Sequence, residues 1–261
     1  MTAALKAMPG HSVTSRSEEE WRLRRELAAC YRLIAHFKMT DLIFTHISMR
    51  IPGPEHHFLI NPYGLFFDEI TASSLVKIGL DGQAVEPTAH LVNPAGFVIH
   101  SAIHGAREDA QCVLHTHTKA GCAIAAQKGG LLPVNQINLE FYGNVAYHDY
   151  EGIALDMDEQ KRLVADLGTK PVMILRNHGL LVTGRSVPEA FLRLYRLERA
   201  CQIQIDAAAA GRLHKLEDAV ARKSGIEMDR FSEMESQNGV GDLEFAALLR
   251  KLDKADPTWR H

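Results

Sequence analysis

The stretch CVLHTHTKAG, residues 112–121, contains two histidines one residue apart, His115 and His117, behind an apolar run. Successive side chains of a β-strand point to opposite faces, so the two imidazoles of this pair would share a face and could chelate one metal ion. A catalytic zinc-type site uses about three protein ligands and keeps one position open. His178 in RNHGLL is the candidate third ligand, at a turn where Gly179 lets the chain bend.

A metal ion held by three neutral imidazoles keeps its positive charge. Such an ion can polarise a carbonyl and stabilise the negative charge that develops when a carbon–carbon bond breaks. A substrate with oxygens on two adjacent carbons would fill the open positions. The set of histidines therefore predicts a divalent metal site suited to cleavage chemistry, and the ligands alone leave the choice between zinc and iron open.

The chain has 14 histidines, and an isolated H-x-H pair is common in proteins without a metal. If only this pair is considered, His115 and His117 could equally be two structural histidines rather than metal ligands. We expect solvated positions for His11, His56, His57, His90, His214 and His261, and a structural position on a helix for His36. The elements around the pair must decide between these alternatives.

Strand and helix patterns alternate along the chain and indicate an α/β layered fold. Ser17 and Ser186 are suited to cap helices that reach about Phe37 and Gly211, and Gly168 to end another helix. Strands are expected at 44–51, 57–62, 111–118, 144–149 and on both sides of a bend at 177–179. A short helix and then a strand pair are expected around Asp81-Gly82. Further helices are expected at 96–109, 119–129 and 156–168.

Composition indicates an ordinary globular protein of 261 residues with a net charge of −3, which excludes a strong nucleic-acid field. No apolar run approaches the roughly 20 residues that cross a bilayer. The four cysteines form no C-x-x-C pair, so we expect reduced core residues in a cytoplasmic protein. We divide the chain into a disordered tail (1–16), one domain (17–211) and a helical extension (212–261) that packs on the domain or on a neighbouring subunit.

Several segments in order resemble the class II aldolase/adducin family, in particular the adducin head and its bacterial relatives. They are FTHISMRIPGPEHHFLINPYGLFFDEITASSLVKI, NPAGFVIHSAIHGARED, VLHTHTKAG, VAYHDYEGIA and LRNHGLLVTG, within residues 18–210. The resemblance implies a three-layer α/β/α sandwich around a mainly antiparallel sheet. It also implies a divalent metal, zinc first and manganese or iron as alternatives, on His115, His117 and His178, and a homotetramer with sites near subunit interfaces.

The chain departs from the sugar-phosphate aldolases of this family at positions that matter for chemistry. Gly96 stands where those enzymes carry a proton-transferring glutamate. His46 replaces an asparagine and Tyr63 a serine in their phosphate-binding motifs. These changes favour a non-phosphorylated oxo-acid, hydroxy-acid or aromatic acid as substrate.

A related dehydratase branch of the family places its catalytic glutamate in a segment similar to INLEFYG, which makes Glu140 the candidate acid/base. The alternative for Glu140 is a carboxylate that orients a ligand histidine. Tyr63 is the second catalytic candidate. The expected substrate contacts are His46, Asn61, His100 and Asn177.

Three functions compete. The first is a metal-dependent lyase that performs aldol cleavage or decarboxylation on a small molecule, with neither nucleic acid nor membrane as a partner. The second is a non-catalytic adducin-like module that binds cytoskeletal proteins such as actin, although the chain lacks the lysine-rich tail of adducins. The third is an iron-dependent oxygenase on the same three histidines.

Overall fold

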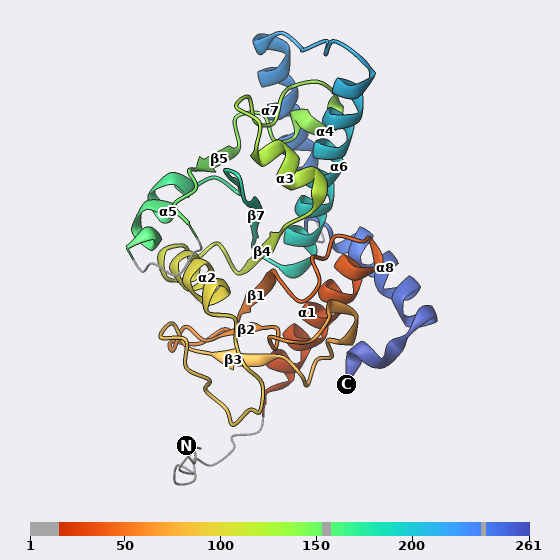
Figure 1. The fold of residues 1–261 in the computed structure, drawn as a ribbon. Helices are drawn as coiled ribbons and strands as arrows, with labels where there is room; N and C mark the ends of the chain where they lie inside the picture. The colour runs from red at the N-terminus through yellow and green to blue at the C-terminus, as the bar shows by residue number, and fades with distance from the viewer. Residues whose placement is uncertain (1–15, 153–157, 236–238) are drawn as a thin grey trace.

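The computed structural model describes residues 16–152, 158–235 and 239–261, so all but the last residue of the tail expected over 1–16 lies outside it. Its described strands form one seven-stranded sheet in the order β3-β2-β1-β4-β7-β6-β5 (Figure 1). Only β5 and β6 run parallel, and the other neighbours are antiparallel. The strands are β1 (His46–Arg50), β2 (Phe58–Ile60), β3 (Val76–Ile78), β4 (Cys112–Thr116), β5 (Val145–His148), β6 (Val172–Leu175) and β7 (Gly179–Gly184).

Helices cover both faces of this sheet. On one face, α2 and α5 bury Ile103 and Leu163 against Val113 of β4. On the other, the long helices α1 and α6, with α3, pack on the opposite side chains of the same strands, such as Leu114. The helices are α1 (Glu18–His36), α2 (Pro94–Ala106), α3 (Lys119–Ala125), α4 (Gln136–Leu139), α5 (Glu159–Leu167), α6 (Val187–Ala210), α7 (Asp218–Glu235) and α8 (Asp242–Ala255), with 3-10 turns η1 (Phe67–Glu69) and η3 (Pro257–Arg260). The three-layer α/β/α sandwich with a mainly antiparallel sheet is confirmed.

The expected helix boundaries hold where the sequence supplies a cap. The Ser17 hydroxyl accepts a hydrogen bond from the Glu20 amide, and the Ser186 hydroxyl accepts one from the Glu189 amide. Gly168 ends α5 with a φ of +52°, a conformation that favours glycine.

Three local expectations are corrected. Helix α3 ends at Ala125 rather than near residue 129, because its last turn tightens into an i to i+3 hydrogen bond from the Gln127 amide to the Ile124 carbonyl. The strand pair around Asp81-Gly82 reduces to β3 and one bridge between Ile78 and Ala84. The short helix α4 was not expected, and the Asn135 side chain caps it by accepting from two backbone amides.

The C-terminal elements α8 and η3 cover part of helix α1. Helix α8 packs on α1 and α6, and η3 packs on α1. Trp259 is buried there, and its carbonyl accepts a hydrogen bond from the Ala72 amide at 3.0 Å. No helix in the described part of the chain is both long and apolar enough to cross a membrane.

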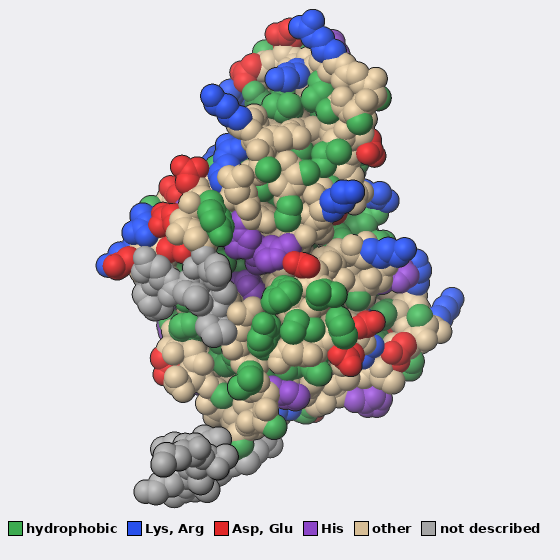
Figure 2. Space-filling view, viewed as in Figure 1, with side chains coloured by type: hydrophobic (Ala, Val, Ile, Leu, Met, Phe, Trp, Pro, Cys, Tyr) green, Lys and Arg blue, Asp and Glu red, His purple; other side chains and the backbone are tan. Residues whose placement is uncertain are grey.

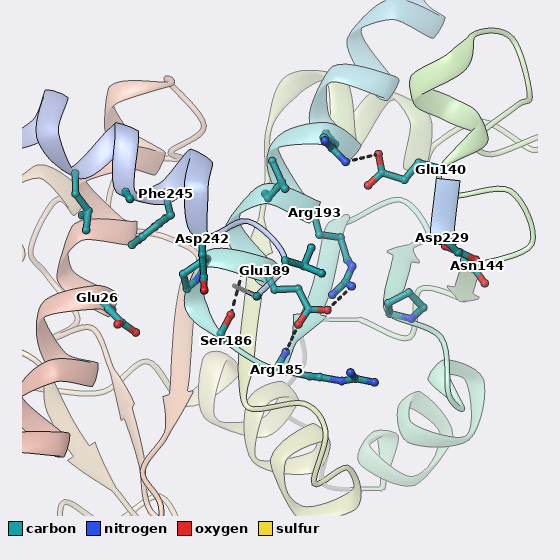
Figure 3. Close-up of a pocket in the computed structure, with 18 of the residues that line it drawn as sticks. Glu26, Glu140, Asn144, Arg185, Ser186, Glu189, Arg193, Asp229, Asp242 and Phe245 are labelled. Carbon is teal, nitrogen blue, oxygen red and sulfur yellow. Dashed lines mark hydrogen bonds and ion pairs between the residues drawn. The ribbon is translucent and has the colours of Figure 1, made fainter. Parts of the chain in front are cut away.

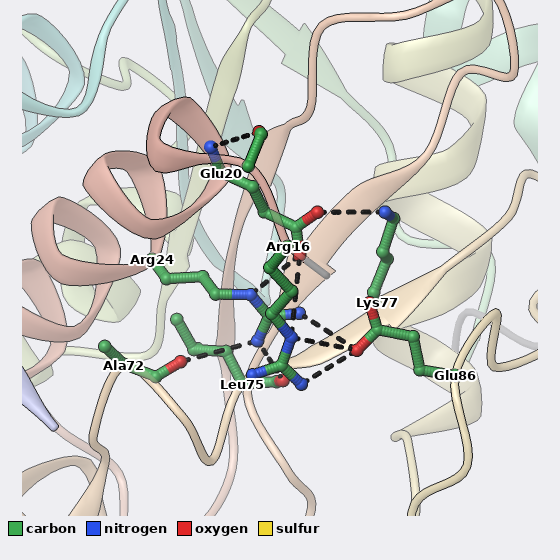
Figure 4. A network of polar contacts seen from close by, with 8 residues as sticks. Arg16, Glu20, Arg24, Ala72, Leu75, Lys77 and Glu86 are labelled. Carbon is green, nitrogen blue, oxygen red and sulfur yellow. Dashed lines mark hydrogen bonds and ion pairs between the residues drawn. The ribbon is translucent and has the colours of Figure 1, made fainter. Parts of the chain in front are cut away.

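A buried ion network joins α1 to β3 (Figure 4). Arg24 is fully buried and donates to Glu20 at 2.8 Å and to the Leu75 carbonyl at 2.8 Å. Lys77 donates to the other Glu20 oxygen at 2.9 Å. Burial by itself would raise the pKa of Glu20, but the hydrogen bonds from Lys77 and Arg24 outweigh it and hold that pKa below its usual value.

We expect Glu20→Gln to destabilise the fold by up to about 3–5 kcal/mol, because the buried Arg24 loses its hydrogen-bonded carboxylate and keeps only Glu86, 3.6 Å away, as a counter-ion. Since the folded pKa of Glu20 is lowered, the carboxylate stabilises the fold fully at pH above about 4.5. This contribution is lost as the pH falls through the folded pKa. Urea unfolding of both proteins at several pH values measures it.

The matched control is Glu19→Gln, one residue away, which removes an exposed ion pair with Arg22 and should change stability little. Equal losses in the two variants, or a loss that does not shrink in acid, would contradict the assignment.

Candidate metal centre

Strand pairing places the three candidate histidines at one end of the sheet. His115 lies on β4 opposite His46 of β1 and Leu181 of β7, so its side chain points toward the α2 layer. His117 follows directly after β4. His178 lies in the turn between β6 and β7, where Asn177 has a positive φ of +56°.

Gly179 is required for a reason other than backbone bending. Its φ is not positive, but a Cβ there would collide with the Thr116 carbonyl of β4. The glycine lets β7 approach β4 closely enough for His178 to reach the other two histidines.

The Nε2 atoms of the three imidazoles converge. His117 Nε2 lies 2.8 Å from His115 Nε2 and 2.9 Å from His178 Nε2. Among the described residues, these three are the one group of histidine, cysteine and acidic side chains whose ligand atoms come together closely enough to share an ion. Figure 2 shows histidine side chains gathered at the centre of the visible face, with hydrophobic side chains beneath them.

The hydrogen bonds behind these rings identify what the Nε2 atoms carry. His115 Nδ1 lies 2.9 Å from the Leu180 carbonyl, and His117 Nδ1 lies 3.1 Å from Asp41 Oδ2. A carbonyl and a carboxylate accept, so both Nδ1 atoms hold the proton and both Nε2 atoms present lone pairs. Burial lowers the pKa of His115 and brings the pKa of His178 to about 4, so both rings are neutral near pH 7. Lone pairs this close repel unless a cation lies between them, so the residues fit a divalent metal.

Two side chains near the centre were missed by the sequence analysis. Asp41, in a bridge with Phe44 before β1, orients His117, but an aspartate in TDLIF carries no pattern that marks it. Tyr150, after β5, is exposed and its ring centroid lies 6.5 Å from that of His178. Position after a strand end was the one available signal for Tyr150.

A second set of histidines lies behind the metal centre. The His46 ring contacts the His115 ring with centroids 5.1 Å apart, and His46 Nδ1 lies 2.7 Å from His100 Nε2. His100 has no exposed surface, and its other nitrogen lies 2.5 Å from Ser48 Oγ. Burial lowers the pKa of both histidines. His46 lies beside His115, and its substrate contact stays a prediction. His100 lies fully buried behind His46 and is hydrogen-bonded to it, away from the three candidate ligands.

The remaining expected contacts differ in position. Asn61 is buried and its side-chain oxygen accepts from the Tyr31 hydroxyl at 2.9 Å, so it belongs to the core beneath α1. Tyr63 is half-buried and forms a backbone bridge with Leu91. Asn177 shapes the turn that carries His178, and its amide donates to the carbonyl of Ala125 in α3.

Glu140 lies elsewhere. It follows α4, pairs with Arg196 of α6 at 3.2 Å, and lines a cavity of about 880 Å³ that contains none of the three histidines (Figure 3). Burial raises its pKa, and Arg196 opposes that shift. Within one chain, Glu140 therefore does not lie at the metal centre, where it was expected to transfer protons. The short helix α4 directs its side chain toward α6 instead.

The sandwich and its three converging imidazoles, which fit a divalent metal, define a protein of the class II aldolase fold. The sequence model described as Class II Aldolase and Adducin N-terminal domain matches residues 25–205, and the chain belongs to this family.

Three relatives show its range. An aldolase II superfamily protein from Pseudomonas syringae is 52% identical, with a TM-score of 0.86 over 94% of this chain and 98% of that one. Rat alpha-adducin (Rattus norvegicus) is 42% identical over 97% of this chain, which spans 36% of the adducin. L-fuculose 1-phosphate aldolase from Glaciozyma antarctica PI12 is 28% identical, with a TM-score of 0.79 and 97% of each chain covered.

Removing Asp41 should weaken the metal centre without removing a ligand. We expect Asp41→Ala to lower zinc affinity about 10–100-fold, because His117 loses the acceptor that fixes its tautomer. His117→Ala should abolish stoichiometric binding. Competition with a zinc indicator and elemental analysis measure both, with His36→Ala, an exposed histidine, as control. Unchanged affinity in Asp41→Ala would contradict this role.

Gly96 of α2 should tolerate no side chain. An added Cβ would lie 2.6 Å from His46 Cδ2, so we expect Gly96→Ala to cost about 1–3 kcal/mol in thermal unfolding. Gly105→Ala, in the same helix with nothing within 4 Å, should be neutral or stabilise slightly. Equal effects of the two substitutions would rule out the clash.

Proposed function

We propose that this protein is a metal-dependent lyase that cleaves a carbon–carbon bond, by aldol cleavage or decarboxylation, in a non-phosphorylated carbonyl or carboxylate substrate. The observation that carries the proposal is the convergence of three Nε2 atoms. His117 Nε2 lies 2.8 Å from that of His115 and 2.9 Å from that of His178, and hydrogen bonds at Nδ1 leave the lone pairs of His115 and His117 on Nε2. Nothing in an ordinary core requires that arrangement.

His115, His117 and His178 would hold the ion, with zinc first and manganese or iron as alternatives. A bound divalent ion supplies Lewis-acid polarisation of a carbonyl oxygen. The chain's own contribution is to hold three neutral ligands on rigid strand ends, with Asp41 and the Leu180 carbonyl setting the ring orientation of two of them.

The surroundings of the histidines support a substrate without phosphate. Among the described residues, the other polar side chains in hydrogen-bond or ring contact with the three histidines are Asp41, His46 and Tyr150, and Arg176 lines a small pocket beside His178. Arg176, the arginine nearest in sequence to His178, donates to the Gln127 carbonyl and stacks on a tyrosine. The phosphate-binding motifs of the sugar-phosphate aldolases are altered here at His46 and Tyr63, so a sugar phosphate such as the one named for the Glaciozyma aldolase fits poorly.

Proton transfer must use a side chain other than residue 96, since glycine has no transferable proton. We assign this role to a phenol, either Tyr150 beside His178 or the half-buried Tyr63. His46 contacts the substrate from the β1 side. Glu140 retains a role only if a neighbouring subunit delivers it.

We further propose a cytoplasmic homotetramer. The exposed Leu42 and Phe44 flank Asp41 at the edge of the centre, where a second copy would cover them. The described cysteines are all free, which fits a reducing compartment.

The similarity to alpha-adducin favours one alternative, a non-catalytic module that binds a protein partner. The two proposals differ in what the histidines are for. A binding module has no need of neutral imidazoles arranged as ligands, so metal content and actin binding separate them.

The first test is metal content of protein purified without chelators, followed by a screen of aldol and β-oxo-acid substrates. We expect about one divalent ion per chain, and turnover that a chelator abolishes and the metal restores. His117→Ala should lower kcat/KM by roughly a thousandfold, since a Lewis acid contributes several kcal/mol. Folded protein without metal, together with saturable actin co-sedimentation, would replace the lyase with the binding module. Oxygen uptake in iron-loaded protein would instead indicate an oxygenase.

A further inference from the structure

A buried chain of hydrogen bonds runs from the metal centre into the interior along α2 and β1. His46 Nδ1 pairs with His100 Nε2 at 2.7 Å, and His100 Nδ1 with Ser48 Oγ at 2.5 Å. Ser48 Oγ pairs with His104 Nε2 at 2.7 Å, and His104 Nδ1 with the Ala110 carbonyl at 3.0 Å. All four side chains are buried, and no metal ligand belongs to the chain. We call it the His46 relay.

The far end of the relay fixes the direction of every link. The Ala110 carbonyl can only accept, so His104 Nδ1 donates and its Nε2 is a lone pair. Ser48 must then donate to His104 and accept from His100 Nδ1. His100 Nε2 is consequently a lone pair that accepts from His46 Nδ1, which leaves the lone pair of His46 on Nε2.

The three relay histidines are neutral, as this direction of the hydrogen bonds requires. The recorded partners of the three relay histidines are other imidazoles, the Ser48 hydroxyl and a carbonyl, and none is a carboxylate. An imidazolium here would be a buried cation without a counter-ion, which is costly.

His46 is the end of the relay that lies against the metal centre, and its remaining lone pair is on Nε2. No described residue hydrogen-bonds this atom, and it is not among the polar atoms sealed from solvent without a partner. The ring lies against His115, and a Cβ on Gly96 would fall 3.1 Å from Nε2. The imidazole thus occupies the space that the absent side chain at position 96 leaves open.

We propose that His46 Nε2 is a fixed hydrogen-bond acceptor that selects substrates carrying a hydroxyl or N–H donor beside the metal-binding oxygens, with His100, Ser48 and His104 as positioning residues. The inference rests on the proposed metal-dependent function, because the metal must bring the substrate to this point. A substrate that presents a carbonyl or carboxylate oxygen to Nε2 would place two acceptors together and be rejected. The selected class is therefore hydroxy-acids over the matching oxo-acids.

The first experiment is independent of metal. Histidine nitrogen NMR of the metal-free protein, labelled with ¹⁵N-histidine, reports which ring nitrogen carries the proton. We expect the proton on Nδ1 of His46, His100 and His104. In Ser48→Ala, His100 should become a mixture of tautomers while His104 keeps its form, since Ala110 still holds it. A proton on His46 Nε2 in the unaltered protein would overturn the relay.

The second experiment measures donor selection in the zinc-loaded protein by calorimetry. Acetohydroxamate and N-methylacetohydroxamate both chelate zinc through two oxygens, but only the first carries an N–H donor. The unaltered protein should prefer the N–H compound by roughly three- to tenfold more than His46→Phe does. Ser48→Ala should lie between them, and His36→Phe should match the unaltered protein.

These experiments distinguish failure of donor selection by His46 from failure of the metal-dependent function. Zinc binding with the same ligand ratio in His46→Phe overturns donor selection and leaves the metal-dependent function standing. Failure of the unaltered protein to bind zinc, manganese or iron removes the proposed function and the substrate contact together, while the NMR result still decides whether the relay has the stated direction.

Discussion

His117 Nε2 lies within 2.9 Å of the Nε2 atoms of both His115 and His178, and the rest of the site depends on this convergence. The register of β1, β4 and β7 sets His115 beside its neighbours, and the tight approach at Gly179 brings the β6–β7 turn over it. Hydrogen bonds that the two Nδ1 atoms donate to the Leu180 carbonyl and to Asp41 fix the orientation of two of the rings. Such fixed ring orientations are expected of a site that is preorganised for a cation.

The packing of α2 on β1 behind the metal centre depends on the lack of a side chain at Gly96. Because residue 96 is a glycine, α2 can approach β1 until its backbone meets the His46 ring. The imidazole then fills the space at the metal centre and connects it to Ser48 and His104 in the interior. The loss of one acidic side chain and the gain of one imidazole are thus a single change in packing. Under the proposed function, this part of the site would accept a hydrogen bond from the substrate rather than transfer a proton.

The helical layer on the opposite face of the sheet contains a cavity lined by ion pairs. The cavity between α6 and α8 is lined by arginines and carboxylates that pair with one another, such as Arg193 with Glu189 and Arg196 with Glu140. These pairs satisfy their own charges and leave no converging set of lone pairs. The two polar regions therefore differ in kind: arginines pair with carboxylates in the cavity, whereas three imidazoles converge at the candidate metal centre.

The sequence by itself determined the local features, because each depends on neighbours in the chain. The strand period put His115 and His117 on one face, Ser17 and Ser186 began their helices, and family resemblance added His178 and the sandwich. Only the tertiary structure decided which distant groups meet. Asp41 lies 76 residues from His117, and Glu140 turned away because an Asn135-capped helix directs it to α6. Such contacts depend on how layers pack, and side-chain period and capping carry no information about that.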